Sequence, residues 1–300
     1  MSRLRISVVE YLNTAPLVWG FTNGPLQGRY GLSFAVPSQC AEQLRRGEVD
    51  IGIIPAIEYQ RMDGVAVLPG LSVAAKGAVR SILVVARKSI EQVRRLALDA
   101  SSRSSQALVR ILCAERWGIQ PEFVEAKPDV AQMLRDADAA LIIGDPALRL
   151  DVQFAQLAAK PRDGEYCCGG DPGQWPIAGL ESIYMYDVAS EWRALTGLPC
   201  VLAVWVGRRE AISAQVAADF LASKQYGLAR IGEIAEAAAE KLELPAAELE
   251  SYLRDSIDFG LDEQNRAGLE LYFRKAAALG LIPSARAVEY AAAPAAAKGM

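Results

Sequence analysis

The chain has 300 residues, of which 52% are hydrophobic and 23% are charged, and its formal net charge is −4. This length is more than one hydrophobic core usually serves, so two domains are expected, and the acidic balance gives no reason to expect nucleic-acid binding. The sequence contains no histidine, which excludes Ser-His-Asp and Cys-His catalysis and the HExxH zinc site.

The five cysteines, at positions 40, 113, 167, 168 and 200, show no C-x-x-C spacing. An odd number without this spacing argues against a disulfide framework or a zinc ribbon, so free thiols in a reducing cytosol are expected. The N-terminal residues lead directly into a strand-like run, which predicts that there is no signal peptide. No apolar stretch is long enough to span a bilayer. We therefore expect a soluble, cytoplasmic protein.

The first part of the chain alternates short apolar runs with helical patterns, which is typical of a parallel α/β fold. Strands are predicted at residues 5–9, 31–36 and 49–54, and a longer one at 79–86. Helices are predicted to begin near Asn13-Thr14-Ala15-Pro16 and at Pro37-Ser38, with Ser38 as the N-cap of the second.

A second series of strands and helices follows the strand at 79–86. Strands are predicted at 95–98, 123–124, 139–143 and 201–206, with helices near 105–117 and 129–136. From about residue 210 to residue 281 the pattern is helical, and Leu249, Tyr252, Leu253 and Ile257 are interpreted as one core-facing stripe. The alanine-rich tail is expected to be disordered.

The strands at 79–86 and 201–206 bracket the second series. A block inserted between two halves of another domain gives two lobes that are joined by two crossing strands, with a hinged cleft between them. We expect one lobe from residues 1–84 and 204–285, a second lobe from 85–203, and a disordered tail from 286–300. In such proteins the ligand lies in the cleft, near strand ends and helix starts.

Four polar loops follow predicted strands and precede predicted helices, so we expect them to meet at one rim of the fold. They are residues 11–14, 37–38, 101–105 and 144–146. Backbone N–H groups at helix starts favour anions, and the hydroxyls of Ser38, Ser102 and Ser104 would add donors. The loops therefore predict a site for a small carboxylate or phosphate. A plainer interpretation is that Asn13, Thr14, Ser38 and Asp145 only cap helices.

Other charged residues near strand ends have both a functional and a structural interpretation. Glu10 and Glu58 are candidate bases, although an ion pair or a rim position is the commoner role of such carboxylates. Lys76 and Arg80 could meet a ligand carboxylate or a neighbouring acid, or be solvated surface charges, and Arg103 could be a solvated surface charge. The tryptophans at 19, 175, 192 and 205 are interpreted as core residues. No dinucleotide fingerprint, Walker A sequence or metal-ligand cluster is present, so no cofactor and no metal are expected.

Several segments resemble the chorismate dehydratases of the futalosine route to menaquinone, in order and over about residues 5–282. They are residues 7–17, Pro37-Ser38 with 47–55, 102–105, 141–148, Tyr186-Asp187 with Glu191-Trp192, and 196–199. The S-R-T-S loop of that family is matched by Ser102-Arg103-Ser104-Ser105, in which serine replaces threonine and keeps the hydroxyl.

This resemblance implies a periplasmic-binding-protein type II fold and a lyase that converts chorismate to 3-[(1-carboxyvinyl)oxy]benzoate without a cofactor. Formation of an aromatic ring drives the loss of water, so orientation of the substrate can replace a strong base. Asn13 is the expected catalytic residue, and the proton is expected to pass to a carboxylate of the substrate itself. The expected substrate-binding residues are Thr14, Ser38, Ser81, Ser102, Arg103, Ser104, Ser105, Gly144 and Asp145.

Two alternatives stay open. A cytosolic binding protein for a small carboxylate would share the fold. The related 1,4-dihydroxy-6-naphthoate synthases typically carry a histidine after the strand that here ends in Ile143-Gly144-Asp145, and this sequence has none. The expected partner is a small-molecule substrate, with no nucleic acid and no membrane. The sequence does not indicate the oligomeric state or a role for Cys167 and Cys168.

Overall fold

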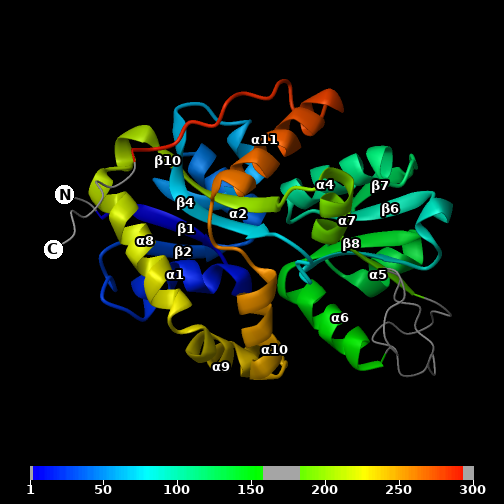
Figure 1. Cartoon of the computed structure of the whole chain (residues 1–300), viewed down its shortest axis with the longest axis horizontal. Helices are drawn as coiled ribbons and strands as arrows, with labels where there is room; N and C mark the ends of the chain where they lie inside the picture. Colours follow the sequence, from blue (N-terminus) through cyan, green and yellow to red (C-terminus); the bar gives the residue numbers. More distant parts are fainter. Residues whose placement is uncertain (1–2, 158–182, 293–300) are drawn as a thin grey trace.

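Two five-stranded mixed sheets, each covered by helices, form two lobes in the computed structural model (Figure 1). The structure describes residues 3–157 and 183–292. The first sheet has the order β2-β1-β3-β10-β4, and the second has the order β7-β6-β8-β5-β9. In both, the central strands are continuous apolar runs that are buried along their whole length, as is typical of strands covered on both faces.

The first lobe contains strands from both ends of the chain. Its strands are β1 (Arg5–Val9), β2 (Gly31–Ala35), β3 (Ile51–Pro55), β4 (Val65–Ala75) and β10 (Cys200–Arg208). Strands β1, β2 and β3 are parallel, as expected, whereas β10 runs antiparallel to both β3 and β4. Its helices are α1 (Ala15–Thr22), α2 (Pro37–Arg45), α3 (Ala56–Tyr59), α8 (Ala214–Leu228), α9 (Ile231–Leu242), α10 (Ala246–Ser251) and α11 (Glu263–Ala278).

The second lobe is one continuous block of the chain. Its strands are β5 (Ile82–Ala86), β6 (Arg95–Asp99), β7 (Glu122–Ala126), β8 (Ala139–Ile143) and β9 (Tyr184–Asp187). Strands β6, β7 and β8 are parallel, and β5 is antiparallel to β8 and β9. Its helices are α4 (Arg103–Glu115), α5 (Val130–Asp136), α6 (Gly144–Leu157) and α7 (Val188–Thr196).

The chain crosses between the sheets twice. It leaves the first sheet after Ala75 and enters the second at Ile82, and it returns between Asp187 and Cys200. The boundaries expected at 84/85 and 203/204 would each cut a strand, because β5 pairs only within the second sheet and β10 only within the first. We therefore propose that the lobes divide at these two connections.

The C-terminal segment packs on the first lobe. The Glu289 carbonyl accepts the N–H of Val67, and the Val67 carbonyl accepts the N–H of Ala291, both at 2.9 Å. The Arg286 guanidinium lies 4.4 Å from the centre of the Tyr59 ring. Pairing with the edge strand β4 thus orders residues 286–292, which we expected to belong to a disordered tail. Residues 293–300 lie outside the described part of the chain.

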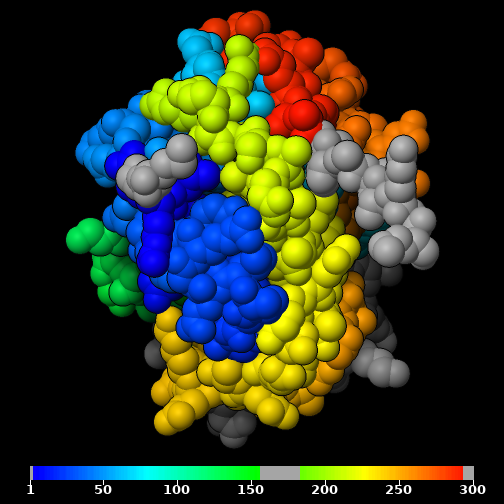
Figure 2. All heavy atoms as spheres, turned by 90° about the vertical axis from the view of Figure 1, so that its left-hand side faces the viewer, coloured from blue at the N-terminus to red at the C-terminus, as the bar shows by residue number. Residues whose placement is uncertain are grey.

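Close packing of α1 against α8 joins the two sequence halves of the first lobe. A Cβ added to Gly227 would come within 2.1 Å of the Pro16 carbonyl oxygen, so only glycine permits this approach. Figure 2 shows the N-terminal residues, in blue, lying against the helices of residues 214–242, in yellow.

Of the tryptophans expected in the core, Trp192 and Trp205 are fully buried. Trp19 is half-buried and lines a pocket, and Trp175 lies outside the described residues. Within residues 3–157 and 183–292, no helix is long and apolar enough to cross a membrane. No group of three or more metal-ligating side chains occurs in that same part of the chain.

Candidate functional site

The polar loops expected at one rim meet in a cleft between the lobes, where a small cavity of about 40 Å³ lies. Asn13 and Thr14 line it from the first lobe, and Ser102, Ser105 and Gly144 line it from the second lobe. Ser81, from the connection between the lobes, completes the polar lining. The apolar part of the wall includes Pro37, Pro55, Ile143 and Leu202.

Asn13 and Ser81 are linked by Tyr252, a residue to which the sequence analysis gave no role at the site. The Tyr252 hydroxyl donates a hydrogen bond of 2.8 Å to Ser81 Oγ. Burial raises the pKa of Tyr252, and hydrogen bonds to Ser81 and Asn13 offset this only in part. Tyr252 is therefore a neutral hydroxyl that fixes two cavity residues. The sequence placed it in a core stripe, and nothing local shows that its hydroxyl meets a serine 171 positions away.

The start of α4 presents hydroxyls to the cavity. Ser102 is its N-cap and accepts the Ser105 N–H, while the Ser102 hydroxyl donates to Ser105 Oγ at 2.9 Å. These two residues are three positions apart, so they lie on one face of the helix. The positive end of the helix dipole and two hydroxyls together favour an anion such as a carboxylate.

Arg103 and Ser104, between those two serines, point to the first lobe and do not line the cavity. Ser104 Oγ accepts the N–H of Ile57 at 3.2 Å. Arg103 forms an ion pair with Glu58, at 3.1 Å between Nη1 and Oε2. Direct contact between either side chain and a ligand in the cavity would require this turn to rearrange. Their role as substrate-binding residues therefore stays a prediction.

Ser38 and Thr14 are held by backbone contacts. Helix α2 begins at Pro37 with Val36 as its N-cap, so the expectation that Ser38 caps the helix was wrong. Proline fits the first helical turn because its missing N–H is not needed there. The Ser38 N–H instead donates to the Ser101 carbonyl across the cleft, at 3.0 Å. The Thr14 hydroxyl donates to the Tyr11 and Val9 carbonyls and fixes the turn after β1.

Gly144 and Asp145 join the second lobe to the loop that carries Asn13. The Asp145 carboxylate accepts the Leu12 N–H at 3.0 Å. Burial raises the pKa of Asp145 to about 6. Gly144 has a φ of +68°, and a Cβ there would lie 2.7 Å from the Tyr11 ring. Only glycine therefore allows both this backbone conformation and the contact with Tyr11.

A second buried carboxylate, Asp99, orders the loop before α4. Its Oδ1 accepts both the N–H and the hydroxyl of Ser101, at 2.8 and 2.6 Å. The Ser101 Oγ lies 3.5 Å from the Tyr11 hydroxyl on the other side of the cleft. Burial raises the pKa of Asp99. The sequence analysis did not name Asp99 as a site residue. Its position as an acid at the end of an apolar strand could have indicated a role near the cleft.

The contacts of Leu12, Ser38 and Tyr11 with the second lobe show that the lobes lie closed. A cavity of about 40 Å³ holds little more than a water molecule, whereas sites for small organic ligands usually measure roughly 300–1,000 Å³. A ligand of ten or more heavy atoms must therefore open the cleft before it can bind.

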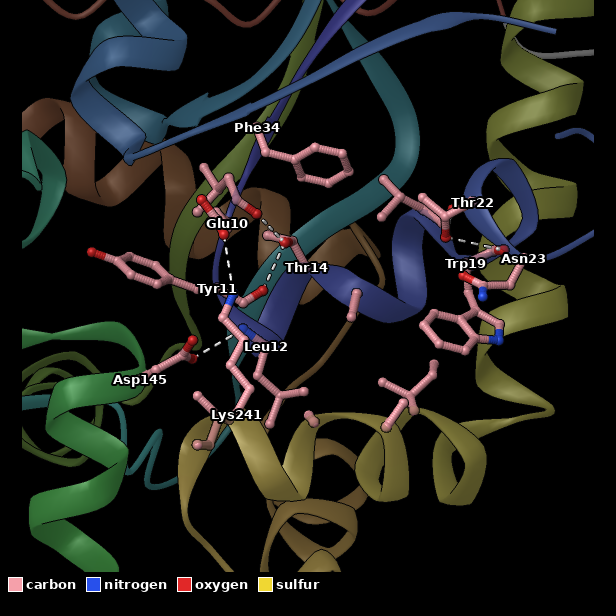
Figure 3. Close-up of a pocket in the computed structure, with 17 residues that line it drawn as sticks. Glu10, Tyr11, Leu12, Thr14, Trp19, Thr22, Asn23, Phe34, Asp145 and Lys241 are labelled. Atoms are coloured by element: carbon pink, nitrogen blue, oxygen red, sulfur yellow. Dashed lines mark hydrogen bonds and ion pairs between the residues drawn. The ribbon is translucent and has the colours of Figure 1, made fainter. Parts of the chain in front are cut away.

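A larger pocket of about 330 Å³ lies beside the first and shares Val9, Tyr11 and Thr14 with it (Figure 3). Most of its lining is apolar and comes from α1 and α9, with the exposed Phe34 ring at one side. Its charged residues are Asp145 and an exposed ion pair between Glu10 and Lys241. We regard the smaller cavity as the candidate site, because the amide, the hydroxyls and the helix start converge there.

The remaining charged candidates are ion-paired. Glu10 pairs with Lys241 at 3.0 Å, and Lys76 pairs with Asp258 at 3.1 Å and with Asp262, all on the surface. Glu58 is fully buried and forms ion pairs with arginines. This agrees with the expected ion-pair role and not with the role of a base.

Arg80 meets neighbouring acids, which was one of its interpretations, and it is not a solvated surface charge. It pairs with Asp151 of the second lobe at 2.7 Å and with Glu248 of the first at 3.0 Å. Its φ of +61° lies in the left-handed region, and the Asp187 carboxylate accepts its N–H at 2.7 Å. Arg80 therefore fixes the connection immediately before Ser81.

Comparison with known proteins agrees with this geometry. A model of the menaquinone biosynthesis family matches residues 4–278. The protein named chorismate dehydratase from Thermus thermophilus is 30% identical over 278 residues, which are 92% of this chain and 95% of that protein.

Two solved structures share the fold, at low sequence identity. Protein AF1704 from Archaeoglobus fulgidus has a TM-score of 0.66 and 19% identity, over 93% of this chain and 98% of that one. The periplasmic aliphatic sulphonate binding protein SsuA from Escherichia coli has a TM-score of 0.60 and 15% identity, over 94% of both chains. The expected periplasmic-binding-protein-like fold is thereby confirmed, and the chain belongs to the menaquinone biosynthesis family.

Proposed function

We propose that the protein is a chorismate dehydratase, a lyase of menaquinone biosynthesis that converts chorismate to 3-[(1-carboxyvinyl)oxy]benzoate and water. The observation that carries the proposal is the convergence of Asn13, Ser81, Ser102 and Ser105 on one interlobe cavity. The relative from Thermus thermophilus that bears this name matches the chain over nearly its whole length.

The lining of the cavity suits a dicarboxylate. The N-terminus of α4, with the hydroxyls of Ser102 and Ser105, takes one carboxylate of the substrate. The Ser81 hydroxyl, which Tyr252 orients, provides a further polar contact. The Asn13 amide holds the region where the bonds break, by hydrogen bonding near the leaving hydroxyl or the enolpyruvyl carboxylate.

The reaction needs one ring C–H bond and the neighbouring ring C–O bond to break. The electron pair of the C–H bond completes the aromatic ring, the hydroxyl leaves, and the proton passes to the enolpyruvyl carboxylate of the substrate before it is lost to water. Holding the substrate in the reactive orientation lowers the barrier, because the carboxylate then lies next to the hydrogen that it removes. Closure of the lobes excludes water and brings Asn13 and the start of α4 to opposite sides of the substrate.

We also propose a cytoplasmic location. Cys40, Cys113 and Cys200 are buried free thiols, as suits a reducing compartment.

Steady-state kinetics with chorismate and the Asn13→Ala variant tests the proposal. We expect the wild type to turn over without an added cofactor, and Asn13→Ala to lose about 100-fold or more in kcat with a small change in KM. Arg95→Ala, on the exposed surface of the second lobe, is the control and should behave as the wild type. Binding of chorismate without conversion would instead favour the small-carboxylate binding protein, and an unaltered kcat for Asn13→Ala would refute its role.

A further inference from the structure

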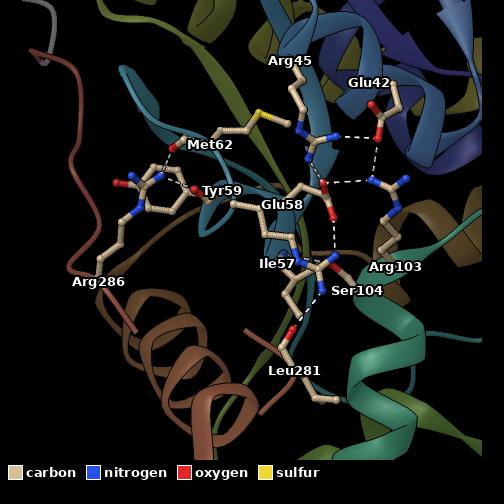
Figure 4. Close-up of polar contacts among 11 residues, drawn as sticks. Glu42, Arg45, Ile57, Glu58, Tyr59, Met62, Arg103, Ser104, Leu281 and Arg286 are labelled. Atoms are coloured by element: carbon tan, nitrogen blue, oxygen red, sulfur yellow. Dashed lines mark hydrogen bonds and ion pairs between the residues drawn. The ribbon is translucent and has the colours of Figure 1, made fainter. Parts of the chain in front are cut away.

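A cluster of charges around one buried carboxylate lies next to the cavity, at the contact between α3 of the first lobe and α4 of the second (Figure 4). At its centre the fully buried Glu58 carboxylate meets three guanidinium groups. Arg61 lies 2.7 Å from Oε1, Arg103 lies 3.1 Å from Oε2, and Arg45 also contacts Oε2. Arg103 is the member that comes from the second lobe.

Glu42 is the second acid of this group, and it pairs with Arg45 at 2.5 Å and with Arg103 at 2.9 Å. We call Glu42, Arg45, Glu58, Arg61 and Arg103 the Glu58 cluster. Its three arginines and two glutamates leave one net positive charge. A buried carboxylate is tolerated only when it is paired and hydrogen-bonded, and the three arginines provide this pairing for Glu58.

The Glu58 cluster is fastened to the residues that line the cavity. Arg103 is the first residue of α4, and the next residue, Ser104, accepts the N–H of Ile57, which is adjacent to Glu58 in sequence. The Tyr272 hydroxyl donates to the Ser104 carbonyl at 3.1 Å. Ser102 and Ser105, on either side of this pair, both line the cavity.

We infer that Glu58 is a positioning residue of the dehydratase. By pairing with Arg103 it fixes the first turn of α4 across the lobe boundary, so that Ser102 and Ser105 are in place for a substrate carboxylate. This inference rests on the proposed function. Glu58 touches no reacting atom, and its effect on catalysis passes through Arg103.

A purely electrostatic explanation makes the opposite prediction. If the cluster acted only by attracting an anion with its positive charge, Glu58→Gln would raise that charge by one and would strengthen chorismate binding. If Glu58 acts by positioning, the same variant loosens the first turn of α4 and weakens binding. The direction in which KM changes therefore separates the two explanations.

The experiment compares kinetics and thermal unfolding of three single variants. Glu58→Gln and Arg103→Gln should each raise KM for chorismate about tenfold or more, with kcat within about threefold of the wild type. Arg61→Gln is the matched control, because Arg61 contacts the same carboxylate but belongs to the first lobe. It should lower the melting temperature while KM stays within about twofold.

A double-mutant cycle then tests whether the effect passes through Arg103. The Glu58→Gln/Arg103→Gln double variant should have nearly the KM of either single variant, because both changes break one contact. If Glu58→Gln does not fold, Arg103→Lys is measured in its place. Lysine keeps the positive charge but lacks the guanidinium fork, so the KM of Arg103→Lys should lie between that of the wild type and that of Arg103→Gln.

The possible outcomes distinguish the two proposals. A wild type that neither binds nor converts chorismate refutes the proposed function and this inference with it. If the wild type binds chorismate but does not convert it, the variants are compared by their Kd for chorismate in place of KM. An active wild type with an unchanged or lower KM in Glu58→Gln, or an equal rise in KM in Arg61→Gln, would overturn the role of Glu58 alone.

Discussion

Replacement of Tyr252 by phenylalanine should damage both the stability and the activity of the protein. The hydroxyl is completely buried and donates to Ser81 Oγ at 2.8 Å. Its removal takes away the hydrogen bonds with Ser81 and Asn13 and leaves the Ser81 hydroxyl without its donor. A buried group left unsatisfied in this way costs about 1–3 kcal/mol, so the free energy of unfolding should fall by that amount.

The effect on activity follows from the two cavity residues that the hydroxyl orients. Without the Tyr252 hydroxyl, Ser81 and Asn13 can adopt other orientations, and we expect kcat/KM for chorismate to fall about tenfold or more. Urea unfolding gives the loss of stability, and steady-state kinetics gives the loss of activity.

Tyr30→Phe is the matched control for this prediction. Tyr30 is also buried, and its hydroxyl donates to the Asp219 carboxylate in the first lobe, outside the cavity lining. This variant should lose stability without losing activity. If Tyr252→Phe loses stability but keeps its kcat/KM, or if Tyr30→Phe loses as much activity, the reasoning that links Tyr252 to the site is refuted.

Two further predictions concern the residues that join the lobes. Gly144→Ala should lower kcat/KM about tenfold or more, because the new Cβ would displace the Tyr11 ring. Gly280→Ala is the control for backbone strain and should keep its activity, because Gly280 has the same φ of +68° and a Cβ added there would have no atom within 4 Å. The pKa of Asp145 is raised to about 6, so the folded chain binds this proton more tightly than the unfolded chain, and the stability due to Asp145 should fall as the pH rises from about 4 to about 6. The fall is at most about 3 kcal/mol, at 1.36 kcal/mol per pKa unit. Urea unfolding from about pH 4 to about pH 6 should show this fall in the wild type and not in Asp145→Asn. If the free energy of unfolding depends on pH equally in both proteins, the raised pKa of Asp145 is contradicted.

Much of the fold could be predicted because its signals are local. Apolar runs at 5–9, 49–54 and 139–143 are strands that are covered on both faces, and the loops that follow parallel strands meet at one edge. The strand β4 (Val65–Ala75) was missed because Pro69 and Gly70 interrupt its apolar pattern. It tolerates them because it is an edge strand of the first sheet, with an irregular register against β10.

The site was predicted at the level of loops but not at the level of side-chain directions. Asn13, Ser102 and Ser105 line the cavity, whereas Arg103 and Ser104 turn to α3. Helical geometry explains this, because residues three apart share a face and the two between them do not. The contacts of Tyr252 and Asp99 depend on packing between distant segments, which no local pattern shows.

The central claim is that this cleft dehydrates chorismate, and analysis of the product tests it most directly. Purified protein is mixed with chorismate without an added cofactor, and the products are separated by chromatography and identified by mass and ultraviolet absorbance. The account predicts that the loss of chorismate is matched mole for mole by 3-[(1-carboxyvinyl)oxy]benzoate. Recovery of intact chorismate from protein that has bound it, or a product that keeps the ring hydroxyl, would contradict the account.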